Sequence, residues 1–113
     1  MSTREQVVRD SYRAFQTADR ALIERCLADE VTFSSPPDPG LDRDGYFARC
    51  WPAAKAHVKD FAIERLIDSG QEIVVTYDAT RADETRFRNT EIFVLDAEDR
   101  ITQIEVYFGW DLD

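Results

Sequence analysis

Glu91 is the residue whose type and position most directly suggest chemistry, because it is an acid inside a strand-like run of apolar and β-branched residues. Alternation along a strand puts Asn89, Glu91 and Phe93 on one face. If that face lines an apolar cavity, the loss of hydration raises the pKa of the Glu91 carboxyl group. A neutral carboxyl group can donate a hydrogen bond to a carbonyl oxygen or act as a general acid.

A purely structural role for Glu91 is the alternative. Its carboxylate can pair with Arg86 or Arg88, or bond to a tyrosine on a helix, and so do no more than fix the register of the sheet. A raised pKa that responds to a ligand favours catalysis, whereas a permanent contact with an arginine favours structure.

Metal and cofactor chemistry has little support in the sequence. The chain has one histidine, His57, and its two cysteines form no Cys-x-x-Cys motif, so no conventional zinc site is predicted. Cys26 and Cys50 fall on the apolar sides of expected helices and are expected to be free, buried thiols. We therefore expect no metal and no cofactor.

Length and charge limit the remaining classes. The chain has 113 residues and is expected to form a single domain over residues 1–113. Its net charge of -9, without a basic patch, makes nucleic acid an unexpected partner. No apolar run approaches the ~20 residues of a membrane span, and no apolar signal segment is present, so we expect a cytoplasmic protein without a membrane partner.

Two helices are expected before the first strand. The spacing of Val8, Tyr12 and Phe15 predicts a helix that ends near Ala18. A second helix, capped by Asp19, is expected to end at residues 29–30. A short strand (31–34) and a rigid proline-rich loop (35–40) follow. The buried residues of the second helix are predicted to be Leu22, Ile23, Cys26 and Leu27.

A third helix is expected to start at Asp42 or Asp44, and Pro52 should kink or end it. The apolar period then changes to two, which predicts further strands and a final hairpin (86–111) with an acidic turn (96–99). The predicted fold is α+β, with three N-terminal helices packed on a curved, mostly antiparallel sheet. Such a sheet leaves a cone-shaped cavity between its concave face and the helices.

The hairpin register decides which residues line this cavity. If Asp96 opposes Ile101, alternation puts the even-numbered residues from 104 to 110 on the cavity face. A slip of one residue would bring in Glu105 and Tyr107, which is less favourable because two close carboxylates resist joint ionisation. In the first register, aromatic residues close the wide end. The expected pocket residues are Tyr12, Phe15, Phe33, Trp51, Asn89, Phe93, Val106, Phe108 and Trp110.

Several short motifs carry a family resemblance. They are Leu27–Phe33 ahead of Pro36, Gly45–Phe47, Arg88–Glu91, Arg100–Ile101 and Val106–Trp110. Together with the order of the elements, they resemble the nuclear transport factor two-like superfamily and its SnoaL-like (polyketide cyclase-like) branch. The resemblance covers essentially the whole chain and implies the cone-shaped, cystatin-like roll of that superfamily. It implies less about function, because this scaffold carries isomerases, hydrolases, dehydratases, cyclases and many non-enzymes.

Ketosteroid isomerases, which are similar in fold, allow a comparison position by position. Their general-base aspartate matches Ser35, and their oxyanion-hole tyrosine matches Ser11, one residue before Tyr12. Their oxyanion-hole acid matches Glu91. The resemblance therefore implies an acid without a base, and we expect no steroid isomerisation, because a serine hydroxyl without a proton acceptor is a poor base at neutral pH.

Two functions follow from these observations. The first is a small acid-base enzyme of the isomerase, cyclase or hydrolase class, with Glu91 as acid on a carbonyl, epoxide or polyketide-like compound. The second is a non-catalytic ligand-binding or dimeric accessory protein, and a protein-binding module is a weaker third. Ile92 and Val94 lie on the strand face opposite Glu91 and predict a homodimer through that face.

Overall fold

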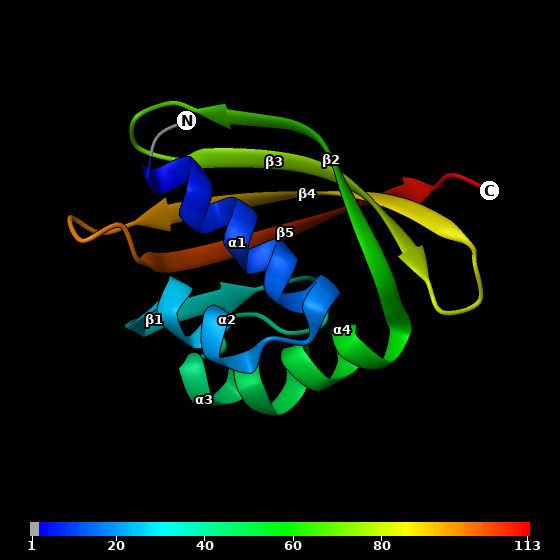
Figure 1. The fold of residues 1–113 in the computed structure, drawn as a ribbon, viewed down its shortest axis with the longest axis horizontal. Coiled ribbons are helices and arrows are strands. Elements are labelled where there is room, and N and C mark those ends of the chain that lie inside the picture. The colour runs from blue at the N-terminus through cyan, green and yellow to red at the C-terminus, as the bar shows by residue number, and fades with distance from the viewer. Residues whose placement is uncertain (1–2) are drawn as a thin grey trace.

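The chain forms one curved five-stranded sheet with its helices gathered on the concave side (Figure 1). The computed structural model describes residues 3–113. Its elements are α1 (Thr3–Thr17), α2 (Arg20–Cys26), β1 (Leu27–Ser34), α3 (Arg43–Gly45), η1 (Tyr46–Cys50), α4 (Trp51–His57), β2 (Val58–Asp68), β3 (Ile73–Arg81), β4 (Arg86–Leu95) and β5 (Ile101–Asp111). The strand order is β1-β5-β4-β3-β2, and only the β1–β5 pair is parallel. The predicted α+β class and mostly antiparallel sheet are therefore confirmed.

The α2 helix ends earlier than predicted. Asp19 caps it as expected, because its side chain accepts a hydrogen bond from the backbone N–H of Leu22 at 3.1 Å. Leu27, which was predicted to be helical, instead begins β1 and lies opposite Ile101 of β5. Leu27 and the following Ala28 are both buried. The apolar stripe thus passes from the helix directly into a buried strand, and this is why periodicity placed the boundary too late.

Two helices precede β1 and the third helical segment follows it, so only part of the predicted helix arrangement is N-terminal. This segment runs continuously through α3, η1 and α4. Asp42 caps it by accepting from the N–H of Gly45 at 2.8 Å. The helix does not end at Pro52, because α4 continues to His57. A wider π-helical turn precedes the proline, in which the N–H of Trp51 donates to the carbonyl of Tyr46 five residues earlier.

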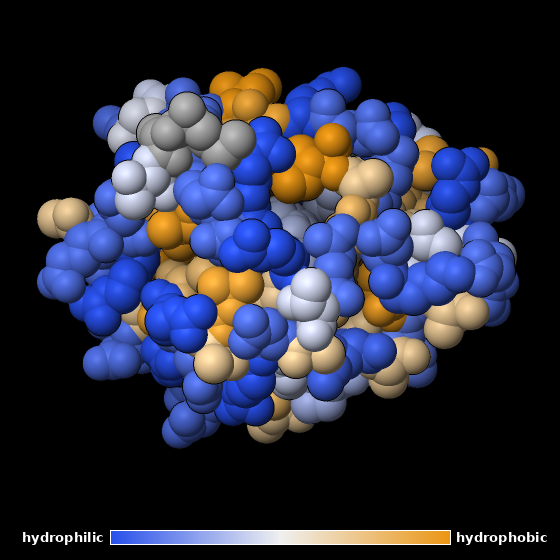
Figure 2. Space-filling view, viewed as in Figure 1, coloured by the Kyte–Doolittle hydropathy of each residue, from blue (hydrophilic) through white to orange (hydrophobic). Residues whose placement is uncertain are grey.

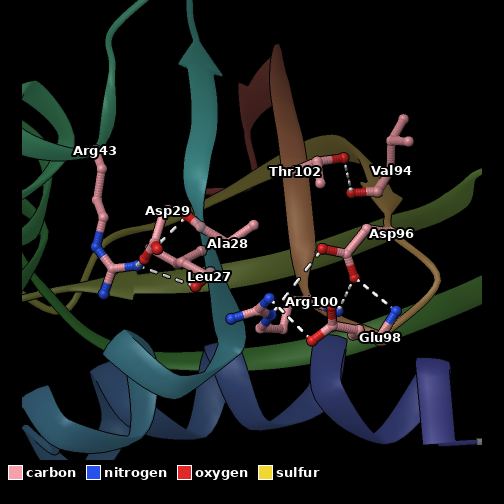
Figure 3. A network of polar contacts seen from close by, with 9 residues as sticks. All are labelled: Leu27, Ala28, Asp29, Arg43, Val94, Asp96, Glu98, Arg100 and Thr102. Atoms are coloured by element: carbon pink, nitrogen blue, oxygen red, sulfur yellow. Dashed lines mark hydrogen bonds and ion pairs between the residues drawn. The ribbon is translucent and has the colours of Figure 1, made fainter.

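Two arginines tie loops to the ends of strands (Figure 3). Arg43 donates to the carbonyl oxygens of Leu27 at 3.0 Å and Ala28 at 3.4 Å, which fixes the start of α3 against the start of β1. In the hairpin turn, the Asp96 side chain accepts from the backbone N–H of Arg100 at 3.0 Å. These contacts hold in place the two loops that flank the β1–β5 pair.

The β4–β5 register matches the prediction in the middle of the hairpin, where Glu91 lies opposite Val106. Glu105 lies opposite Ile92 and is therefore on the other face, so the slipped register is not formed. At the turn, Leu95 rather than Asp96 opposes Ile101. The register shifts by one residue between Leu95 and Val94, so that Val94 opposes Gln103 as the prediction requires.

A second irregularity lies near the end of β5. Asn89 lies opposite Phe108, and Arg88 lies opposite Trp110, so Gly109 is an extra residue in β5. A side chain at this position would place its Cβ 2.1 Å from the carbonyl oxygen of Arg88, so the bulge requires glycine. It also turns Trp110 to the face of Arg88, where 64% of the residue is exposed.

The core fills the space between α1, α2 and the concave face of the sheet. Its largest fully buried side chains are Phe93, Ile23, Leu27, Ile73, Ile101, Val8 and Val75. Burial of such side chains stabilises the fold by about 1.5–3 kcal/mol each. On the helix-bearing side, apolar groups reach the surface only in small patches among hydrophilic ones (Figure 2). Within residues 3–113, none of the helices combines the length and apolar character that crossing a membrane requires.

Candidate functional site

A cavity of about 350 Å³ lies between the concave face of the sheet and the helical elements. This volume falls within the usual range for small-molecule sites. Its wall includes the predicted residues Tyr12, Phe15, Phe33, Asn89, Glu91, Phe93, Val106 and Phe108. The wall is therefore largely aromatic and aliphatic, with a few polar groups.

Two predicted pocket residues are outside this wall. Trp51 is buried behind it and packs on Phe15, with ring centroids 4.7 Å apart. Trp110 borders a neighbouring pocket instead of this cavity, because the Gly109 bulge turns it to the other face. Of the two aromatic residues predicted to close the wide end, Phe108 does line the cavity, and it is 60% exposed.

Glu91 is held at the sheet side of the cavity by two tyrosines. The Tyr12 hydroxyl, from α1, donates to Glu91 Oε2 at 2.6 Å. The Tyr77 hydroxyl, from β3, donates to Glu91 Oε1 at 3.3 Å. The Tyr12 ring packs against three other rings, with centroid distances of 5.5 Å to Phe61, 5.3 Å to Tyr77 and 5.9 Å to Phe93. The donors are thus fixed by packing as well as by hydrogen bonds.

Asn89 extends this hydrogen-bonded chain to the rim. Its side-chain oxygen accepts from the backbone N–H of Gly109 at 3.1 Å, which directs its amide nitrogen inward. That nitrogen donates to the Tyr77 hydroxyl at 3.3 Å. Because this hydroxyl already accepts from Asn89, its own proton is free to point at Glu91. The bulge therefore helps to orient a donor deep in the site.

Burial raises the pKa of Glu91 to about 7, although the hydrogen bonds from Tyr12 and Tyr77 pull the value downward. Burial also raises the pKa of both tyrosines, so each remains a neutral donor. Close to pH 7 the Glu91 carboxyl group is thus roughly half protonated. It can donate a proton in one form and accept one in the other.

The arginines that could neutralise Glu91 have other partners. Arg88 forms two hydrogen bonds with Asp78 on the outer face, at 2.6 and 3.1 Å. Arg86 pairs with Asp113 at 3.0 Å. Among residues 3–113, no ion pair includes Glu91. Of the structural alternatives for this residue, the bond to a helix tyrosine is the one that occurs.

Several cavity residues were not identified from the sequence, and Tyr77 is the most important of them. Tyr77 lies directly opposite Asn89, and it shares a strand face with Ile73 and Val75. The alternation of its own strand was therefore a usable signal. The other lining residues that were not proposed for the pocket include Ile23, Tyr46, Arg49 and Phe61.

The two positions matched to the ketosteroid isomerases, Ser11 and Ser35, both border the cavity. The Ser11 hydroxyl donates to the carbonyl of Val8 at 2.6 Å, so its proton is already used. Tyr12, one residue later, supplies the donor to Glu91 instead. The acid and a tyrosine donor are therefore both present, with the tyrosine shifted by one position.

The described residues give little support for a nucleophilic thiol or a bound metal ion in this site. Cys26 and Cys50 are free, and burial raises the pKa of each to about 11, so both are protonated at neutral pH. Within the described part of the chain, no group of three or more His, Cys, Asp or Glu side chains is arranged to hold a metal ion. Besides the tyrosine hydroxyl groups, the polar groups of the wall that can take part in acid-base chemistry include Glu91, Asp38 and His57.

Solved structures with little sequence identity have the same fold. An NTF2-like (nuclear transport factor two-like) protein of unknown function from Burkholderia pseudomallei is 24% identical, with a TM-score of 0.78 over 96% of this chain and 92% of that one. A protein of unknown function with a cystatin-like fold from Methylobium petroleophilum is 20% identical, with a TM-score of 0.79 over 94% and 75%. A de novo designed protein with a curved β-sheet reaches 0.82 at 13% identity, over 96% and 88%. These similarities establish the cystatin-like fold and leave the activity open.

No curated protein matches the chain. The SnoaL-like domain family matches residues 8–104, a range that includes Glu91 and both of its tyrosine donors. This match covers most of the chain and confirms the resemblance seen in the sequence motifs. The chain therefore belongs to the SnoaL-like family of the nuclear transport factor two-like superfamily.

Proposed function

We propose that the cavity binds a flat, mainly apolar compound with a carbonyl or epoxide oxygen, and that Glu91 acts on this oxygen as a general acid. The observation that carries the proposal is a carboxyl group with a pKa of about 7, set in a largely apolar wall and without an ion-pair partner among residues 3–113. Perturbed carboxyl groups of this kind are typical of acid-base sites.

The chemical step requires little movement. The protonated Glu91 donates to the ligand oxygen, and the proton passes to that oxygen as negative charge develops on it. The resulting carboxylate is then stabilised by the hydroxyl groups of Tyr12 and Tyr77, which already point at its two oxygens. An isomerase, cyclase or hydrolase of the SnoaL-like type would use such a step.

A binding experiment tests the role of Glu91 directly. The probe is 2-acetonaphthone, a flat aromatic ketone, titrated by calorimetry between about pH 5 and pH 9. Affinity should fall by roughly tenfold above pH 7 in the wild type, because only the protonated acid donates to the ketone. In Glu91→Gln the amide donates at every pH, so the pH dependence should disappear.

Glu105→Gln is the matched control, because Glu105 lies on the same sheet but faces away from Glu91 and accepts from Gln103 at 2.8 Å and Tyr107 at 3.0 Å. It should keep the wild-type pH dependence. If Glu91→Gln kept that dependence too, Glu91 would not be the group that binds the ketone.

A non-catalytic ligand-binding or accessory protein is the second candidate. It is favoured by Ser35, which occupies the position of the isomerase base and has no histidine among its hydrogen-bond partners. Exchange of the methyl protons of 2-acetonaphthone with D₂O, followed by NMR, separates the two. Exchange that is faster than in buffer and lost in Glu91→Gln supports an enzyme. Tight binding without exchange, together with no isomerisation of a β,γ-unsaturated ketosteroid, supports the accessory role.

The proposal includes a homodimer that pairs through the outer face of the sheet. Ile92 and Val94 on this face are only half-buried in the single chain, and a two-fold partner would cover them. Light scattering should report twice the chain mass at micromolar concentration, and Ile92→Glu should halve it. A monomeric wild type would refute the dimer. A cytoplasmic location also remains part of the proposal, supported by the free thiols of Cys26 and Cys50.

A further inference from the structure

The cavity has a second polar region on the loop that follows β1. Ser35 and Asp38 belong to one tight turn, in which the N–H of each residue donates to the carbonyl of the other, at 3.2 and 3.1 Å. Both residues border the cavity. The turn is therefore a fixed part of the wall.

Arg49 occupies only one oxygen of the Asp38 carboxyl group. Its Nε lies 2.8 Å and its Nη2 lies 2.7 Å from the same atom, Asp38 Oδ1. Among residues 3–113, no hydrogen-bond donor reaches Oδ2. The Asp38 side chain is 19% exposed, and Oδ2 is not among the fully buried polar atoms, so this oxygen is open to a ligand or to solvent. The free oxygen is thus an oriented acceptor beside the cavity.

The sheet register gives the backbone spacing between the strand that leads into this turn and the strand that carries Glu91. Ser34, which immediately precedes the turn, lies opposite Glu105 of β5, and Glu105 lies opposite Ile92 of β4. Each strand spacing is about 4.8 Å, so the start of the turn lies about 10 Å from the neighbourhood of Glu91. Between them the cavity wall is apolar, with Phe33 and Val106 among its residues. Two fused rings can bridge such a gap.

We infer that Asp38 is a specificity-determining residue whose Oδ2 accepts a hydrogen bond from a hydroxyl group on the ligand. The preferred ligand class is then a flat bicyclic or larger ring system with a carbonyl group at one end and a hydroxyl group at the other. The carbonyl end rests on the proposed function, because it is placed at Glu91. The hydroxyl end rests on Asp38 and Arg49 alone.

Two ketones that differ by one group test this inference. In 6-hydroxy-2-acetonaphthone the second ring carries a hydroxyl donor, and in 6-methoxy-2-acetonaphthone the donor is replaced by a methyl ether. Without a specific contact, the more apolar methoxy compound should bind more tightly. With the Asp38 acceptor, the hydroxy compound should bind about tenfold more tightly, measured by calorimetry at about pH 6, where Glu91 is mainly protonated.

Asp38→Asn should reverse this preference. Arg49 keeps the remaining side-chain oxygen of the asparagine at the Oδ1 position, so the amide nitrogen replaces Oδ2 and turns the acceptor into a donor. The methoxy compound should then bind at least as tightly as the hydroxy compound. Asp29→Asn removes an equal charge from an exposed side chain outside the cavity and should leave the wild-type preference unchanged.

The outcomes separate this inference from the proposed function. If the wild type shows no preference for the hydroxy compound but keeps the Glu91-dependent pH response, the Asp38 site is refuted and the carbonyl site stands. If the preference is present but the pH response is absent, the carbonyl site is refuted and the Asp38 site stands. If neither ketone binds at its solubility limit, both are refuted. The wild-type comparison needs no variant, so it remains decisive even if Asp38→Asn does not fold.

Discussion

The two faces of β4 show how one strand can carry two different kinds of charged residue. On the outer face, Arg88 pairs with Asp78 through two hydrogen bonds, and these bonds hold the pKa of Asp78 below its usual value. On the cavity face, three residues further on, Glu91 has tyrosine partners and, within the described residues 3–113, no ion-pair partner, and burial raises its pKa to about 7. The pKa values of two carboxyl groups, Asp78 and Glu91, are therefore shifted in opposite directions by their surroundings on the two faces of one sheet.

The difference between the two pKa shifts indicates which carboxyl groups are candidates for acid-base catalysis. A carboxylate that is paired with an arginine is fully ionised at neutral pH and has no proton to give. A carboxyl group that is partly buried among rings and phenols exchanges its proton near neutral pH, but this arrangement makes the folded state less stable when the group is ionised. Stability measurements on the two faces can therefore test the comparison.

The largest expected effect concerns packing on the cavity face. Phe93 is 1% exposed, and Phe93→Ala should lower the free energy of unfolding by about 3–5 kcal/mol, because it leaves a hole in the core. Ile92→Ala, its neighbour on the outer face, should cost only about 1 kcal/mol in the dissociated single chain, where Ile92 is half-buried. Urea unfolding of both variants checks this. Equal losses would mean that the outer face is as well covered as the core.

The second effect is a gain in stability. The raised pKa of Glu91 means that the folded state binds a proton more tightly than the unfolded state does. Its cost is absent below about pH 4.5, grows between pH 4.5 and 7, and is constant above that. Glu91→Gln removes this cost and should stabilise the protein by about 3 kcal/mol at pH 8, with no gain at pH 4.

Thermal unfolding at several pH values measures this gain, with Glu105→Gln as the control on the opposite face. The control should change stability little at any pH. A loss of stability in Glu91→Gln at pH 8 would mean that the tyrosine hydrogen bonds outweigh the cost of burial, and Glu91 would then be structural.

The sequence alone was enough to assign the fold class and the orientation of Glu91, because both depend on local alternation. Strand parity put Asn89, Glu91 and Phe93 on one face, and the structure has them in the cavity wall. The family resemblance added the helix–sheet arrangement that makes a cavity of that face. These inferences needed no contact between distant residues.

Other features depend on contacts that no local pattern contains. Trp110 was assigned to the pocket by continuing the alternation, but one extra residue, Gly109, reverses the parity beyond it. Leu27 is apolar enough for either a helix or a buried strand, and only its pairing with Ile101 decides between them. The free oxygen of Asp38 follows from the geometry of a single salt bridge with Arg49. Such details require the folded structure.

The third prediction concerns the two donors to Glu91. Removing a hydrogen bond to the ionised form raises a carboxyl pKa, so Tyr12→Phe should raise the pKa of Glu91 by on the order of one unit. Tyr77→Phe should raise it less, because its bond is 3.3 Å long and that of Tyr12 is 2.6 Å. NMR titration of the ¹³C-labelled carboxyl group measures both values. Equal shifts would mean that the two bonds have similar strength in solution.

The smallest expected effect is a loss of stability in Asp78→Asn, the outer-face counterpart of Glu91→Gln. Asp78 has a lowered pKa because Arg88 donates two hydrogen bonds to its carboxylate, so its contribution to stability is present above its unfolded pKa of about 3.9. That contribution is lost as the pH falls through the folded pKa. Asp78→Asn should therefore be less stable than the wild type at pH 7 and equally stable near pH 2, with a loss at pH 7 that is smaller than the gain from Glu91→Gln because the pair is partly exposed. The pH dependence of the two variants is thus opposite in sign: at neutral pH one loses a favourable charge and the other loses an unfavourable one. If Asp78→Asn were also stabilising at pH 7, the cost of removing water from the Asp78–Arg88 pair would exceed the attraction between the two charges. Both carboxyl groups would then destabilise the folded protein when ionised, and the two faces would not differ in this respect.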